Sequence, residues 1–255
     1  MYPTLLTIGR LSIPTYTLLL DLGLILGLLL AWKEGERRLG DGLAVVDLAL
    51  WAIVGGIVGG RIGYVLVNWD AFGEDWSRVW RIWEGGLGFH GAFLGGLAAF
   101  CLAAKMRRWD GEMVWRVLDS LTPGLALGVA FGWAACLVGG CAYGKTGQGI
   151  GYVILPDLYG VQASRFATQA VGMAFSFLLF VGAWLRRERQ AVAGVAFLTY
   201  GLLYFAGQFL LEFTRGDEAL YLGPLRLAQV LDLTLASTAG MLLLLRRQMT
   251  HGRLG

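Results

Sequence analysis

Seven long apolar stretches alternate with short polar or charged segments along the chain. They cover residues 14–32, 44–67, 87–104, 117–143, 166–185, 192–213 and 227–245. Each is close to the roughly 20 apolar residues that a helix needs to cross a hydrocarbon core about 30 Å thick. The ten-residue alternation of a membrane β-barrel does not occur in this pattern. The pattern predicts an all-α, polytopic membrane protein with seven transmembrane helices, forming one integral membrane domain over residues 1–255.

Composition and charge agree with a membrane protein. Hydrophobic residues make up 56% of the chain and charged residues only 15%, and the mean hydropathy is +0.61. These values exclude an ordinary soluble domain. The net charge of +3 reflects basic residues in the loops of one membrane side, and it is not evidence for binding of nucleic acid.

The distribution of lysine and arginine predicts the orientation, because cytoplasmic loops carry the excess of basic residues. Most of them follow the first, third, fifth and last stretches: Lys33, Arg37, Arg38, Lys105, Arg107, Arg108, Arg116, Arg186, Arg187, Arg189, Arg246, Arg247 and Arg253. We therefore expect the N-terminus outside and the C-terminus in the cytoplasm. Residues 1–15 lack the pattern of a cleavable signal peptide, so the first span is expected to act as its own signal.

His90 is one of two histidines and stands near the start of the third apolar stretch. An ionisable side chain at the edge of a membrane span is a functional candidate, because burying it there is costly. Glu84 precedes it closely enough to share a site. The alternatives are an interfacial histidine that caps or hydrogen-bonds a neighbouring helix, and a glutamate at the water surface.

Arg61 lies inside the second apolar stretch, among glycines with overlapping GxxxG spacing. Such glycines let another helix approach closely. A guanidinium at this depth must pair with a carboxylate, line a wet cavity or meet an anionic ligand. We favour the ligand or the cavity over a purely structural ion pair.

Polar residues also gather at the ends of the fourth and sixth stretches. Gln208, Glu212 and Arg215 share one helical face, where a helix-end ion pair is the alternative to a functional site. Pro123 predicts a kink or break in the fourth span. The glycine-rich run 139–151 that follows this span has the composition of a loop that cradles a phosphate.

Three features concern the membrane surface. The connection 68–86 is rich in tryptophan and predicts an amphipathic helix in the headgroup layer. Tyr16, at the start of the first span, fits an aromatic anchor. Cys136 and Cys141 lie near the oxidising face, and they either pair or pack as inert thiols.

Several of these runs together resemble prolipoprotein diacylglyceryl transferase, a seven-helix membrane enzyme of bacteria. GGRIGYVL at 59–66 is similar to the family's second-span motif, and RIWEGGLGFHG at 81–91 is similar to its aromatic-acidic-glycine turn leading into Phe-His-Gly. EFTR at 212–215 resembles its Glu-Phe-aromatic-Arg signature, Tyr16 its first-span tyrosine, and Gln229 its last-span glutamine. The similarity covers the seven spans in order.

Four positions depart from the family's pattern. Trp133 and Gln208 stand where two arginines are expected, Cys136 where an asparagine is expected, and Cys141 where a glutamate is expected. The run ASRFATQ at 163–169 is a reduced form of the family's Pro-Ser-Gln region. These departures concern the chemistry more than the fold.

The resemblance implies transfer of the diacylglyceryl group from phosphatidylglycerol to the lipobox cysteine thiol of a prolipoprotein, with release of glycerol phosphate. It implies His90, Arg61 and Glu212 as catalytic residues. The substrate-binding residues would be Tyr16, Glu84, Asp119, Gly144, Arg165, Arg215 and Gln229. The reaction would need no metal and no cofactor. The partners would be the prolipoprotein signal peptide, phosphatidylglycerol and other membrane lipids, near the outer leaflet of the bacterial cytoplasmic membrane.

The residues present fit the demands of this reaction in part. A thiol needs a base or a positive field to become a thiolate, and His90 is the candidate base. A phosphate leaving group needs cations aimed at its developing charge. Arg61 is the candidate cation, with Arg165 or Arg215 as stand-ins for the missing arginines.

Three other classes of protein are alternatives to this enzyme. A non-catalytic relative that binds or presents a phospholipid is favoured by Trp133 and Gln208. A retinal protein needs a lysine in the last span, but the only lysines are Lys33, Lys105 and Lys145. A channel or transporter would be expected to show internal repeats, and none is visible.

Overall fold

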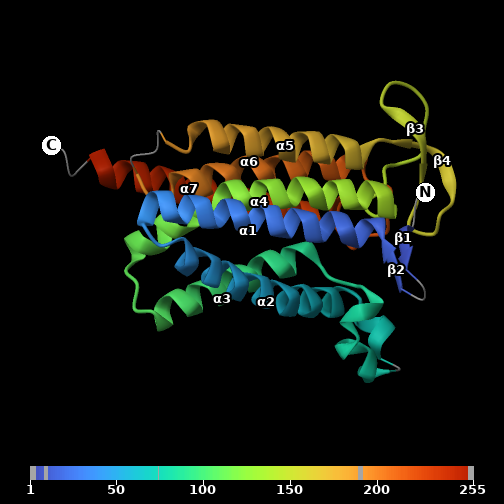
Figure 1. The fold of residues 1–255 in the computed structure, drawn as a ribbon. Coiled ribbons are helices and arrows are strands. Elements are labelled where there is room, and N and C mark those ends of the chain that lie inside the picture. The colour runs from blue at the N-terminus through green and yellow to red at the C-terminus, as the bar shows by residue number, and fades with distance from the viewer. Residues whose placement is uncertain (1–3, 9–10, 74, 189–191, 252–255) are drawn as a thin grey trace. The chain divides into compact units, whose positions relative to one another are not determined.

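The structure is a computed structural model that describes residues 4–8, 11–73, 75–188 and 192–251. Within this part of the chain, seven helices are long and apolar enough to cross a membrane. They are α1 (Thr15–Leu39), α2 (Gly42–Val67), α3 (Phe89–Met106), α4 (Gly111–Gly139), α5 (Thr168–Arg186), α6 (Val195–Leu211) and α7 (Leu227–His251) (Figure 1). The predicted all-α membrane fold is confirmed. The orientation of the termini stays a prediction.

Several helices extend beyond the predicted spans into charged turns. Helix α1 continues to Leu39 and α7 to His251, because lysine, arginine and glutamate are good helix formers and need no membrane. Helix α4 runs through Pro123 without a break. The predicted break is therefore absent. The predicted kink stays a prediction, since proline deprives one carbonyl of its helical partner.

The contacts divide the chain into two compact units. Unit 1 comprises Met1–Ala31 and Leu118–Gly255, and unit 2 comprises Trp32–Val117. The single domain expected from the sequence stays a prediction. We describe the two units separately.

In unit 2, helices α2 and α3 pack against each other through glycine (Figure 1). A Cβ atom on Gly59 or Gly91 would collide with the backbone of the opposite helix. Gly55 and Gly95 form a second such contact one turn away. The overlapping GxxxG spacing therefore serves close helix packing, as the sequence predicts.

In unit 1, α6 packs against α5 and α7, and α1 packs against α4 where Gly27 meets Gly124. Asp119 on α4 caps the start of α6. Its carboxylate oxygens accept hydrogen bonds from the N–H groups of Gly194 at 2.8 Å and Phe197 at 2.9 Å. A carboxylate satisfies the free N–H groups of a helix N-terminus in this way.

Short elements complete the two units. Three antiparallel hairpins pair β1 (Thr4–Ile8) with β2 (Leu11–Pro14), β3 (Tyr152–Pro156) with β4 (Gln162–Phe166), and β5 (Tyr221–Leu222) with β6 (Leu225–Arg226). The connection between α2 and α3 forms three short 3-10 helices, η1 (Trp69–Phe72), η2 (Trp76–Trp80) and η3 (Ile82–Glu84). The continuous amphipathic helix predicted there is therefore wrong. Glycine is unfavourable inside a helix, and this connection contains Gly73 and the pair Gly85–Gly86.

Candidate functional site

Arg61 lies less than two turns before the end of α2, and it is only 8% exposed. All five N–H donors of its guanidinium are directed at backbone carbonyl groups of the connection between α2 and α3. The acceptors are Val79 at 2.8 Å from Nε, Gly85 at 2.6 Å and Gly86 at 3.0 Å from Nη1, and Arg78 at 2.5 Å and Arg81 at 3.3 Å from Nη2. The donors that were expected to meet an anionic ligand or a wet cavity hold this segment instead.

Two glycines make this arrangement possible. Gly85 and Gly86 have φ angles of 88° and 80°, a region that side chains with a Cβ atom rarely adopt. Gly86 also lies against the ring of Tyr64, which leaves no room for a Cβ atom. Next along the chain, the N–H of Gly88 donates to the carbonyl of Gly60 at 2.9 Å. The two most diagnostic sequence runs, 59–66 and 81–91, therefore bind each other.

His90 is the second residue of α3, directly after this contact. Its side chain is half-buried, and its ring meets that of Phe89 edge to face, with 5.6 Å between centroids. Glu84 ends η3, but its side chain lies outside the described part of the chain. Unit 2 thus places the candidate base where a membrane helix starts, next to a fixed loop.

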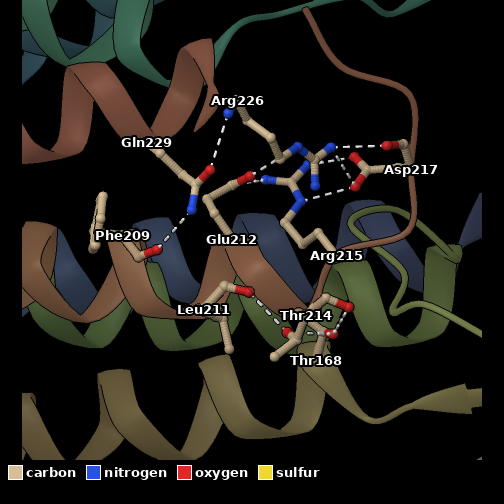
Figure 2. A network of polar contacts seen from close by, with 9 residues as sticks. All are labelled: Thr168, Phe209, Leu211, Glu212, Thr214, Arg215, Asp217, Arg226 and Gln229. Atoms are coloured by element: carbon tan, nitrogen blue, oxygen red, sulfur yellow. Dashed lines mark hydrogen bonds and ion pairs between the residues drawn. The ribbon is translucent and has the colours of Figure 1, made fainter. Parts of the chain in front are cut away.

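Unit 1 contains a second polar cluster, formed by Glu212, Arg215, Asp217 and Arg226 (Figure 2). Glu212 begins η4 (Glu212–Thr214) at the end of α6. Arg215 is bonded to the carboxylates of Glu212 and Asp217. Arg226 Nη2 lies 3.1 Å from Asp217 Oδ1, and its Nε lies 3.3 Å from Glu212 Oε2. Two arginines and two carboxylates therefore neutralise each other in a site where Glu212 and Arg226 are buried and Arg215 and Asp217 are partly exposed.

Gln229 on α7 supports this cluster. Its side-chain oxygen accepts the backbone N–H of Arg226 at 2.9 Å, and its amide nitrogen donates to the carbonyl of Phe209 at 3.4 Å (Figure 2). Both helices that flank the cluster are thereby tied to it. The structure brings Glu212, Arg215 and Gln229 together, as the sequence-based site requires, and adds Asp217 and Arg226.

The charges of this cluster are mutually stabilised. Burial alone would raise the pKa of the Asp217 carboxyl, but hydrogen bonds and charge from Arg215 and Arg226 hold that pKa below its usual value. Burial alone would lower the pKa of the Arg215 guanidinium. Hydrogen bonds and charge from Asp217 and Glu212 outweigh this and raise that pKa above its ordinary value. Both groups therefore stay ionised at neutral pH.

Some buried donors of unit 1 have no acceptor within the described residues. They are Nε and Nη1 of Arg226, Nε of Arg165 and Nε2 of Gln208. A buried donor without a partner costs free energy, although Nε of Arg226 still has Glu212 near it. These groups are available to an acceptor other than the described residues.

The positions that depart from the family's pattern all lie in unit 1. Trp133 is buried against Gly172 on α5, and its indole N–H donates to the side chain of Tyr204. Gln208 lies one turn before Glu212 on α6 and is 7% exposed. Cys136 and Cys141, whose pairing the sequence left open, form a disulfide. It closes the turn that follows α4.

The remaining candidates of unit 1 have structural partners. Arg165 pairs with Asp157 at 2.9 Å and stacks over the ring of Tyr143, 4.5 Å from its centroid. Gly144 forms an isolated β-bridge with Arg215. The aromatic ring of Tyr16 contacts Gly139 at the end of α4. The roles expected of Arg165, Gly144, Arg215 and Tyr16 stay predictions.

Two expectations meet the structure less well. Asp119 caps the start of α6, whereas Glu212 follows the end of that helix of 17 residues, about 25 Å away along its axis. Asp119 therefore lies apart from the Glu212 cluster. In the glycine-rich run, the N–H groups of Gly140, Lys145 and Gly147 bond to protein carbonyls, so these three donors are not free for a phosphate.

Sequence reasoning did not select Asp217 and Arg226 as site residues. Asp217 lies two positions after Arg215, and Arg226 lies three positions before Gln229. The available signal was a charged residue within three positions of a candidate residue in each case. In the part of the chain that the structure describes, no group of three His, Cys, Asp or Glu side chains is arranged to hold a metal ion.

Comparison with known proteins places the chain among bacterial relatives. A family model described as "Prolipoprotein diacylglyceryl transferase" matches residues 3–245. A phosphatidylglycerol–prolipoprotein diacylglyceryl transferase of Synechococcus elongatus is 34% identical over 244 residues, which cover 91% of this chain and 82% of the relative. Proteins of the same name from Oceanobacillus iheyensis and Bacillus velezensis are each 30% identical, covering 96% of this chain and 88% and 92% of the relatives, respectively. The resemblance read from the motifs is confirmed, and the chain belongs to the prolipoprotein diacylglyceryl transferase family.

Proposed function

We propose that this protein transfers the diacylglyceryl group of phosphatidylglycerol to the lipobox cysteine of prolipoproteins, the first step of lipoprotein maturation. The observation that carries the proposal is the family match over residues 3–245. The names of the relatives state both the lipid donor and the protein acceptor. The hydrogen bonds between the runs 59–66 and 81–91 also support the proposal. They join the two most characteristic motifs of the family next to His90.

The transfer exchanges one bond for another. The cysteine thiolate attacks the carbon of the diacylglyceryl moiety that bears the phosphate, a carbon–sulfur bond forms, and the bond between that carbon and the phosphate oxygen breaks. The bonding electron pair leaves on the oxygen of glycerol phosphate. His90 is the proposed base that takes the thiol proton, because an imidazole can accept a proton at neutral pH and this one is half-buried at a helix start.

The leaving phosphate needs donors that are not already used. All five N–H groups of Arg61 are engaged, whereas Nε of Arg165 and Nη1 of Arg226 have no acceptor within the described residues. The latter donors support a role for arginines of unit 1 toward phosphate oxygens. Tyr16, Glu84, Asp119, Gly144, Arg215 and Gln229 remain proposed substrate-binding residues, and Glu212 a proposed catalytic one.

The proposed place of action is the cytoplasmic membrane of a bacterium. Seven apolar helices and the bacterial relatives support a multi-pass inner-membrane protein. The basic loops support a cytoplasmic C-terminus. With that orientation, the connection that precedes His90 and the EFTR run face the outer leaflet.

A non-catalytic relative that binds a phospholipid is the second candidate. It is favoured by one observation: Trp133 and Gln208 stand at positions where the family pattern has arginine. Trp133 in particular is buried against protein and donates to Tyr204. This candidate predicts lipid binding without transfer.

The test is transfer from labelled phosphatidylglycerol to a lipobox peptide by the purified full-length protein. We expect transfer by the wild type and loss of transfer in His90→Gln. The matched control is His251→Gln, which changes the only other histidine and should leave transfer intact. Phosphatidylglycerol binding without transfer by the wild type would favour the second candidate, and full activity of His90→Gln would remove His90 from the mechanism.

A further inference from the structure

The connection between α2 and α3 folds back along α2. We call residues 69–87 the tryptophan arm, because they include Trp69, Trp76, Trp80 and Trp83. Arg61 lies six residues before Val67, where α2 ends, which is about 9 Å along the helix axis. The five carbonyl groups bonded to Arg61 belong to residues 78–86 of the arm. The second half of the arm is therefore held at the level of Arg61.

The contact depends on the shape of the guanidinium as much as on its charge. Its five N–H groups lie in one plane, and each meets a separate carbonyl oxygen. The rings of Tyr64 and Phe72 flank it, at 5.8 Å and 5.5 Å from their centroids. No carboxylate among the described side chains pairs with Arg61. A lysine, with three donors on one nitrogen, can keep the charge but cannot reproduce this set of contacts.

The arm leads directly into the helix that carries His90. Gly85 and Gly86, whose carbonyls both accept from Nη1, come shortly before His90, and Gly88 is bonded to Gly60 on α2. The start of α3 is thus tied to α2 at consecutive points. Loss of the Arg61 contacts would release the segment before α3, which determines the position of the His90 imidazole.

The exposed side of the arm is aromatic. Trp80 is 79% exposed, Trp83 77% and Trp76 55%. The arm starts where one membrane helix ends and finishes where the next begins. Arg61 holds its second half at the level where α3 begins. Tryptophan is enriched at the depth of the lipid headgroups, so these rings fit contact with lipid.

We propose that Arg61 is a positioning residue that clamps the tryptophan arm, which fixes the start of α3 and sets Trp80 and Trp83 in the lipid headgroup layer. The kinetic consequence rests on the proposed transfer reaction. The ordering of the arm and its contact with lipid do not depend on that reaction, so both can be measured whether or not the protein transfers lipid.

The wild-type protein in lipid nanodiscs supplies the first test, by amide hydrogen exchange. A clamped arm exchanges slowly over residues 76–88, at least about tenfold more slowly than an unprotected loop. Exchange at the unprotected rate would overturn the clamp without any variant.

The second test compares Arg61→Lys with Arg61→Gln. We expect both to speed exchange over residues 76–88 by about tenfold or more, and both to lower kcat more than they raise KM for phosphatidylglycerol. The control is Arg107→Lys, an arginine of the same unit whose ion pair with Asp47 is exposed and which should behave as the wild type. If Arg61→Lys keeps both arm protection and activity, Arg61 acts as a charge and the proposal fails. Protection kept with transfer lost would assign Arg61 to the chemistry instead.

The third test locates the arm by quenching tryptophan fluorescence with phospholipids brominated near the headgroup or deep in the acyl chains. Trp80→Phe combined with Trp83→Phe should reduce the part quenched by the shallow label. Trp51→Phe, which changes an exposed tryptophan inside α2, should reduce the part quenched by the deep label and leave the shallow part unchanged. Unchanged shallow quenching in the double variant would show that the arm does not contact the headgroup layer.

Discussion

The two units bury arginine in two different ways. In unit 2, Arg61 is surrounded by five neutral backbone carbonyl groups. In unit 1, Arg215 and Arg226 are held mainly by the carboxylates of Glu212 and Asp217. Arg61 is 8% exposed and Arg226 4%, so both side chains have lost most of their contact with solvent.

The difference lies in what replaces the lost water. Carbonyl dipoles can stabilise a cation only if the backbone points them at it, so the Arg61 site depends on the positive φ angles of Gly85 and Gly86. Carboxylates carry their own charge, so the Arg226 site depends on the ionisation of Asp217 and Glu212. The first site is expected to be sensitive to backbone geometry and the second to charge and pH.

The largest expected effect comes from removing a charge in unit 1. Arg226→Gln leaves Glu212 and Asp217 sharing Arg215, and we expect a loss of about 3 kcal/mol in the free energy of unfolding, since breaking a buried ion pair strands its partner. The measurement is unfolding in mixed detergent micelles.

The control for this change is an exposed pair. Arg107, which pairs with Asp47, has a side chain that is 40% exposed, and Arg107→Gln should cost less than about 1 kcal/mol. Equal losses in the two variants would mean that burial of the Arg226 cluster adds nothing.

The next largest effect tests the geometry of unit 2. Gly86→Ala forces a Cβ atom into the Tyr64 ring at a φ of 80°, and we expect a loss of about 2 kcal/mol. Gly85→Ala meets a similar φ of 88° with no atom within 4 Å of the added Cβ, and it should cost about 1 kcal/mol, from backbone strain alone. Unfolding of both variants, with amide exchange over residues 76–88, measures the difference. A smaller loss for Gly86→Ala than for Gly85→Ala would contradict the packing against Tyr64.

The smallest effect is the acid response of unit 1. The pKa of Asp217 is lower in the folded protein than its ordinary value, so its contribution to stability is present above that ordinary value, near pH 4. It is lost as the pH falls through the folded pKa. The difference in stability between wild type and Asp217→Asn should therefore shrink on acidification from pH 7 toward pH 3. The carbonyl acceptors of Arg61 do not titrate, so the stability contributed by the Arg61 contacts should not depend on pH in this range. A difference that stays constant with pH would mean that Asp217 is not held ionised by the arginines.

The apolar pattern was sufficient for the fold. A run of about 20 apolar residues has few options other than a membrane helix, and each of the seven predicted stretches became one. The short motifs were sufficient for the family, because GGRIGYVL and WEGGLGFHG keep several residue types in fixed order. Neither inference required knowledge of which helices touch.

Pairing between distant residues was decided by the tertiary structure alone. Arg61 and Gly85 are 24 positions apart, and Asp119 and Gly194 are 75 positions apart. Periodicity states which face of a helix is apolar, but it does not state which polar group will meet an isolated arginine or aspartate. The sequence therefore marked Arg61 as costly to bury, whereas only the folded chain assigned its donors to the arm and placed Arg226 beside Glu212.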